Sequence, residues 1–119
     1  MIQIRKSSER GHFDHGYEQK AFSDDEKRGR LRLIASRDGR EGSVTIHQDT
    51  DLYATILKPG EKAGHSLKPG RHAWVQVVRG EILLNGQDLW DSDGAAVSGE
   101  NSAELTAKTD AEVLVFDLP

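Results

Sequence analysis

The histidines are the side chains of this sequence best suited to metal binding or proton transfer, and four of the five form two pairs by spacing. His12 and His15 lie three positions apart, so on a helical turn their imidazoles can share a zinc ion. His65 and His72 flank a Lys-Pro-Gly turn that can bring their strands together. Two imidazoles do not make a tight site, and strand alternation puts His72 on the face opposite Ala73. We therefore expect an exposed pair at 65 and 72 and a structural role for the first pair.

The residues of this sequence do not support nucleophilic or nucleotide-dependent catalysis. The chain has no cysteine, which excludes disulfides, cysteine-zinc sites, iron–sulfur clusters and thiol catalysis. No Gly-x-Ser-x-Gly nucleophile elbow occurs. Gly39 and Gly42 lack the spacing and the following helix of a phosphate-binding loop. The sequence therefore predicts no nucleophilic or nucleotide-dependent enzyme.

Composition limits the partners of the chain. Its 119 residues carry a net charge of −4, whereas nucleic-acid binding requires a clustered basic surface. Lys27, Arg28 and Arg30 form a small basic patch, but the acidic residues 24–26 directly before them cancel most of its field. No apolar run approaches the roughly 18 residues of a membrane span, and no signal-peptide core is present. We expect a cytoplasmic protein that binds neither nucleic acid nor membrane.

From Arg30 onward, short apolar runs alternate with turn residues. This pattern is typical of an all-β sandwich or barrel. The runs are 31–35, 44–48, 52–57, 73–78, 82–84, 95–98, 103–107 and 112–117. Asn85 and Gly86 form the strongest break, because both tolerate the positive φ of a two-residue type I′ hairpin. Residues 2–5 predict one more strand, Ser23 can cap a short helical turn, and His47 is expected as a partly covered residue on its strand.

Alternation within two runs predicts which side chains face inward. Ala73, Val75 and Val77 share one face, whose small and β-branched residues suit the interior of a small barrel. Trp74 lies on the opposite face and also needs cover. The run 113–116 is apolar on both faces, which predicts a central, buried strand.

Several separated blocks of sequence support a family resemblance. The chain opens with Ile-Arg-Lys at 4–6, Glu-Arg-Gly-His at 9–12 and Asp-His-Gly at 14–16. Further blocks lie at 33–36, 38–43, 47–49, 74–80, 85–86, 93–94 and 112–119. The first blocks resemble the start of the pirin-like bicupins, a family associated with quercetin dioxygenase activity, and the remainder resembles their second, C-terminal cupin domain. The resemblance implies an all-β fold: a single cupin domain, a small antiparallel β-barrel (jelly roll) of about eight to ten strands.

The ligand positions of the cupin metal site are replaced in this sequence. The first cupin motif places two histidines and a glutamate between two glycines. Its spacing falls on Gly60, Ser66, Lys68, Ala73 and Gly80. Serine is a weak ligand, lysine is normally cationic and alanine offers no donor atom. The second motif places Leu105 at its histidine position, and Glu104 beside it is expected to face solvent.

A whole domain is missing relative to the family. In pirin-like proteins the Asp-His-Gly block leads into an N-terminal cupin, in which three histidines and one glutamate hold a single metal. Here Gly16 is followed at once by Tyr17, which resembles the entry to the second domain. We therefore expect a natural or engineered deletion, with residues 1–16 as an N-terminal strand segment and 17–119 as the cupin domain. None of the family's metal ligands can be carried over to this chain.

The sequence predicts a non-catalytic, structural cupin domain with no catalytic residue, no cofactor and no metal site. Two alternatives stay open. One is a quercetin dioxygenase-like, metal-dependent oxygenase with a rebuilt site. The other is a binding module, with a small ligand in the barrel or a protein on the Trp74 face. Because the two barrels of a bicupin pack together, loss of one should expose apolar surface, so we expect a homodimer.

Overall fold

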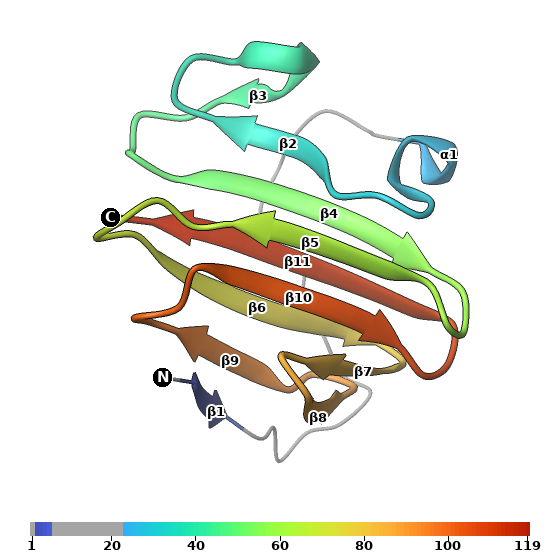
Figure 1. The fold of residues 1–119 in the computed structure, drawn as a ribbon. Helices are drawn as coiled ribbons and strands as arrows, with labels where there is room; N and C mark the ends of the chain where they lie inside the picture. The colour runs from blue at the N-terminus through green and yellow to red at the C-terminus, as the bar shows by residue number, and fades with distance from the viewer. Residues whose placement is uncertain (1, 6–22) are drawn as a thin grey trace.

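The computed structural model describes residues 2–5 and 23–119, which form eleven strands and two short helical turns (Figure 1). The strands are β1 (Ile2–Arg5), β2 (Arg32–Ser36), β3 (Val44–Thr45), β4 (Asp51–Leu57), β5 (Lys62–Ser66), β6 (His72–Arg79), β7 (Glu81–Leu84), β8 (Gln87–Trp90), β9 (Gly94–Val97), β10 (Ser102–Ala107) and β11 (Ala111–Leu118). The helical turns are α1 (Asp24–Lys27) and η1 (Arg40–Gly42). No helix in this part of the chain is long and apolar enough to cross a membrane.

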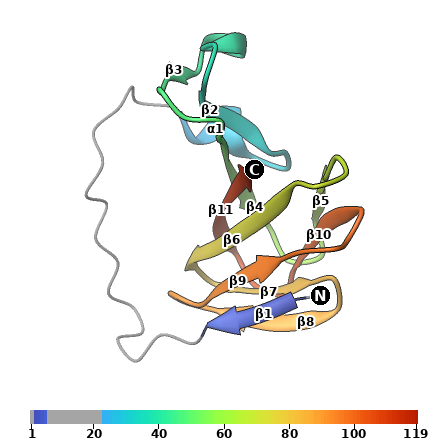
Figure 2. The same cartoon turned by 90° about the vertical axis from the view of Figure 1, so that its left-hand side faces the viewer.

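The strands form two sheets that face each other (Figure 2). The larger sheet has seven strands in the order β1-β9-β6-β11-β4-β2-β3, and the smaller has four in the order β5-β10-β7-β8. Neighbouring strands are antiparallel except β2 and β3. No strand pairing joins the two sheets within the described residues. The all-β jelly-roll prediction is therefore confirmed in the form of a two-sheet sandwich, with β1 added at one edge.

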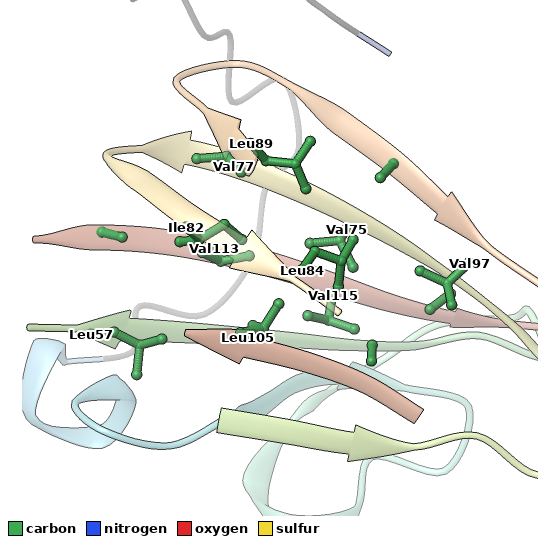
Figure 3. Close-up of a cluster of buried hydrophobic side chains, with 14 of the residues drawn as sticks. Leu57, Val75, Val77, Ile82, Leu84, Leu89, Val97, Leu105, Val113 and Val115 are labelled. Carbon is green, nitrogen blue, oxygen red and sulfur yellow. The ribbon is translucent and has the colours of Figure 1, made fainter. Parts of the chain in front are cut away.

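Aliphatic side chains fill the space between the sheets (Figure 3). On β6, Ala73, Val75 and Val77 are at most 1% exposed, which confirms the predicted inward face. The smaller sheet contributes Ile82, Leu84 and Leu105 among others, each essentially without contact to solvent. Burial of a side chain of this size stabilises a fold by about 1.5–3 kcal/mol. This interior is the main source of the sandwich's stability.

Three local predictions are also confirmed. Asn85 and Gly86 both have positive φ, 47° and 86°, and connect β7 to β8 in a two-residue hairpin. Strand β11 lies between β6 and β4 in the larger sheet and is buried on both faces at 113–115. Ser23 caps α1 in a capping box, in which its side chain accepts from the Glu26 amide and Glu26 Oε1 accepts from the Ser23 amide. The hydrogen bond from Arg32 lowers the pKa of Glu26, and the backbone bond from Ser23 adds to this.

The predicted strand at 44–48 is wrong in length. Strand β3 ends at Thr45, so His47 lies in a loop and is exposed rather than partly covered on a strand. Strands β5 and β8 were not among the predicted apolar runs. Both are edge strands of the smaller sheet, and neither contains a run of three apolar residues that could mark it. The eleven described strands exceed the predicted eight to ten for this reason.

The outer face of the larger sheet carries a second, smaller apolar cluster built on Ile34, Leu52, Ala54 and Leu114. Trp74 is half-buried on this sheet, where its indole lies against Gly94 and its Nε1 donates to Gln76 Oε1 at 3.2 Å. A side chain at position 94 would collide with the indole ring. The cover that the tryptophan requires is therefore supplied in part by its own sheet.

Candidate functional site

Residues around the turn from β5 to β6 and the C-terminal end of β11 form a polar hollow of about 550 Å³. These two segments lie at the same end of the sandwich (Figure 1). Four cations and four carboxylates line the hollow: Arg37, Arg40, Lys68, Arg71, Asp38, Asp49, Asp51 and Asp117. Tyr53, His65 and Ser66 complete the wall. Pockets for small ligands typically measure about 300–1,000 Å³, so this hollow is large enough for one.

Asp117 forms the floor of the hollow and is 8% exposed. It accepts a hydrogen bond from His65 Nε2 at 2.7 Å and one from Arg71 Nε at 2.8 Å. Because an ionised carboxylate only accepts hydrogen bonds, the Nε2 atom of His65 carries the proton. The bond to Asp117, followed by that to Asp49, raises the pKa of Arg71. The Tyr53 ring lies over His65, with 4.6 Å between ring centroids.

A second group of ion pairs also lines the hollow. Arg40 Nη2 donates to Asp51 Oδ2 at 2.6 Å, and its Nη1 donates to Asp38 Oδ1 at 3.1 Å. The bond to Asp51 is the main cause of a raised Arg40 pKa, and the backbone amide of Arg40 is the main cause of a lowered Asp38 pKa. Burial raises the pKa of Tyr53, with a smaller contribution from the charge of Asp51. The phenol is therefore neutral at physiological pH.

The replaced cupin positions divide between this hollow and the core. Ser66 and Lys68 line the hollow, whereas Ala73 lies in the aliphatic interior at 1% exposure. No group of three or more histidine, aspartate or glutamate side chains positioned to hold a metal occurs in residues 2–5 and 23–119. The residues at the motif positions do not fit a cupin metal centre, since they offer one weak ligand, one cation and one methyl group.

The second-motif positions behave as predicted. Leu105 is 1% exposed in the interior, and Glu104 is exposed on the other face of β10. The Glu104 carboxylate lies against Gly64 of the neighbouring strand β5. The prediction of a solvent-facing carboxylate at this position is confirmed.

The predicted pairing of His65 with His72 is wrong. The two residues lie on β5 and β6, which belong to different sheets, because the turn between them crosses from one sheet to the other. The His65 side chain is 14% exposed and bound to Asp117, whereas His72 is exposed with its Nδ1 3.1 Å from Ser98 Oγ. His12, His15 and the junction between Gly16 and Tyr17 lie outside the described residues.

The basic patch after α1 is engaged in local contacts. Lys27 Nζ lies 3.8 Å from a Glu112 carboxylate oxygen, and Arg28 Nε lies 3.3 Å from Asp25 Oδ1. Arg30 Nε donates to the Glu26 carbonyl at 2.8 Å. These contacts offset the field of the patch, as the neighbouring acidic residues suggested.

Sequence reasoning missed the floor of the hollow, although one signal for it was present. Asp117 follows Val113 and Val115 at alternate positions of the same strand, which puts a carboxylate on an inward-facing series. An acidic residue at such a position requires cationic or hydrogen-bonding partners. Arg40 comes from the short helical turn η1 and Asp49 from a loop, and no periodicity in the sequence marks either residue.

The two facing sheets and the jelly-roll order of their strands define a cupin-type domain, in which the first-motif positions carry residues that do not fit the cupin ligand set. Residues 33–118 match the family described as "Quercetinase C-terminal cupin domain". The chain belongs to this family.

Relatives of known name agree with this assignment. The chain is 41% identical over 103 residues to quercetin 2,3-dioxygenase of Escherichia coli K12, covering 87% of this chain and 43% of that protein. It is 32% identical over 96 residues to the pirin-like protein YhaK of the same organism, covering 76% of this chain and 41% of that protein. The chain thus spans less than half the length of the curated relatives that it matches.

Solved structures show the same fold. YhhW from Escherichia coli superposes with a TM-score of 0.79 at 39% identity, over 87% of this chain and 43% of that one. A second structure, described as bacterial pirin YhhW in complex with nickel(II), gives 0.73 at 40% identity, over 75% and 39% of the two chains. The resemblance to pirin-like proteins is therefore confirmed for the part of them that this chain matches.

Proposed function

We propose that this chain is a non-catalytic, structural cupin domain derived from a pirin-like bicupin. The observation that carries the proposal is the closed aliphatic interior between the sheets, in which Ala73 occupies a metal-ligand position of the first cupin motif. A redox metal in a protein needs several nitrogen or oxygen ligands around one point. Methyl and methylene groups occupy that space here.

The alternative is a quercetin dioxygenase-like activity, which the names of several relatives suggest. Such an activity in this chain requires a metal held by residues other than the motif positions. Asp117, His65 and Asp49 are the ligand types that lie together in the hollow, but the single guanidinium group of Arg71 already binds both carboxylates. Because a metal would have to displace this cation, metal binding at the hollow is unfavourable.

Metal content and oxygen consumption test the proposal together. The chain, purified without an affinity tag and dialysed against a weak chelator, is analysed for iron, nickel, copper, manganese and zinc. Oxygen uptake with quercetin is then measured after each metal is added back. We expect substoichiometric metal and no turnover above buffer, with the full-length Escherichia coli K12 quercetin 2,3-dioxygenase as the positive control.

One tightly held metal per chain together with quercetin turnover would overturn the proposal. In that case two variants locate the metal. His65→Ala removes the imidazole that lines the hollow, and His72→Ala removes an exposed imidazole elsewhere. Loss of metal in the first variant alone would place a rebuilt centre at the hollow.

Self-association is the partner interaction that we propose for this domain. The outer face of the larger sheet carries Val44, Ile46, Val78 and Phe116, which are half-buried against the second apolar cluster. Packing of two such faces removes apolar surface from water. Light scattering over a concentration series is expected to give a dimer that Phe116→Lys weakens. A monomer at all concentrations would contradict this interaction.

A further inference from the structure

Two cations at the hollow have no carboxylate partner among residues 2–5 and 23–119. Arg37 and Lys68 both line it, both are exposed, and neither forms an ion pair with the described part of the chain. Lys68 occupies a position where the cupin motif has a histidine. Long cationic side chains at the rim of a hollow are free to reorganise around a bound group.

The carboxylates of the hollow are already bound. Asp38 and Asp51 both contact Arg40, while Asp49 and Asp117 both contact Arg71. Because all four acceptors are engaged by guanidinium groups, the charged groups left for a ligand are hydrogen-bond donors. This balance disfavours a metal cation and favours an oxyanion, which accepts from lysine and arginine.

The rings of Tyr53 and His65 also line the hollow, and they are held in place. The bond to Asp117 fixes the His65 ring, and Tyr53 lies against it at a tilt of 46° between ring planes. A planar organic group can pack on this Tyr53–His65 surface while its charged end meets the rim. The volume of about 550 Å³ leaves room for both parts.

We propose that the hollow binds a small organic anion, whose carboxylate or phosphate group is held by Arg37 and Lys68 while its organic part packs on the Tyr53–His65 surface. This inference goes beyond the structural role, since a domain without catalysis can still bind a ligand. It does not depend on that role, because Arg37, Lys68 and His65 lie outside the aliphatic interior and Tyr53 only borders it.

An NMR titration of the ¹⁵N-labelled chain tests the site with two probes, inorganic phosphate and benzoate, each against sodium chloride of equal ionic strength. We expect saturable shifts at the backbone amides of residues 37–40, 65–68 and 70–71. Binding of phosphate alone supports a phosphorylated ligand, and binding of benzoate supports an aromatic carboxylate. Absence of saturable shifts with both probes overturns the proposal.

Matched lysine variants separate a specific site from general charge attraction. Lys68→Ala removes a rim cation and is expected to weaken binding about tenfold, the effect of one charge-assisted hydrogen bond. Lys68→Glu should abolish binding. Lys62→Ala removes an exposed lysine at the start of β5, outside the hollow, and should leave the affinity unchanged. Equal affinities for Lys68→Ala and Lys62→Ala would overturn the proposal.

Discussion

The interior between the sheets and the hollow at their end show two different uses of the same strands. On β11, Val113 and Val115 are fully buried among aliphatic side chains, whereas Asp117, two residues further along the same face, binds His65 and Arg71. The interior is stabilised by removal of apolar surface from water. The hollow is a network of ion pairs open to solvent on one side.

The contrast between the aliphatic interior and the polar hollow shows which part of this domain carries polar groups that can bind a ligand. Strands β5 and β6 contribute the replaced motif positions to both regions, Ser66 to the hollow and Ala73 to the interior. The scaffold has kept its two-sheet geometry while the polar groups lie at the end rather than at the centre. Stability and binding are therefore assigned to different residues, and single substitutions can separate them.

The largest effect is expected in the interior. Leu105→Ala removes most of a side chain that is 1% exposed, and the remaining cavity adds to the loss of apolar burial. We expect the free energy of unfolding to fall by about 2–5 kcal/mol, measured by urea denaturation. Leu83→Ala, at a half-buried position on β7, is the matched control and should cost less. Equal losses would mean that the interior is not the main stabilising region.

The next effect concerns the floor of the hollow. Asp117→Asn leaves one amide oxygen to serve two donors, and the amide NH₂ faces the groups that the carboxylate bound. We expect a loss of about 1–3 kcal/mol in the free energy of unfolding at neutral pH. Asp110→Asn, at an exposed position before β11, is the control with no loss expected. No difference between the two variants would show that the floor contributes nothing to stability.

A smaller effect is expected at the rim. Lys68 is exposed and unpaired within the described residues, so Lys68→Ala should change the free energy of unfolding by less than about 0.5 kcal/mol. Thermal denaturation of both proteins at the same ionic strength gives the comparison. A clear destabilisation would reveal a structural role for this lysine and weaken the division between the two regions.

The raised pKa of Tyr53 should make the free energy of unfolding depend on pH in alkaline solution and not at neutral pH. Because its folded pKa is raised, the neutral phenol is favoured in the fold. This contribution to stability is intact below the ordinary tyrosine pKa of about 10 and is lost as pH rises through the folded value. In an ultraviolet phenolate titration, the later of two tyrosine transitions should disappear in Tyr53→Phe. Two indistinguishable transitions at the ordinary value would contradict burial of this phenol.

The sequence predicted the interior much better than the hollow. Alternation on β6 identified Ala73, Val75 and Val77 because each inward position is apolar, and the Asn85–Gly86 break placed the hairpin after β7. Burial gives such positions a periodic signal. Polar edge strands have none, so β5 and its residue His65 were misjudged.

The hollow depends on contacts between distant parts of the chain. Arg71 and Asp117 meet through the register of β6 and β11, and Arg40 reaches Asp51 from the turn at η1. Side chains of these types are common on any protein surface, so their positions in the sequence did not indicate the site. Only the strand order brings them together.

The edge strands have a consequence for association through backbone hydrogen bonds. The four edges of the described sheets are β1, β3, β5 and β8, which are four, two, five and four residues long, whereas the central strands β6 and β11 each have eight. A short edge offers few unpaired amide and carbonyl groups to an incoming strand. Strand β1 also covers the small apolar strand β9 along its whole length. Without residues 2–5, a Gly-Ala-Ala-Val edge would be open to amyloid-like strand addition.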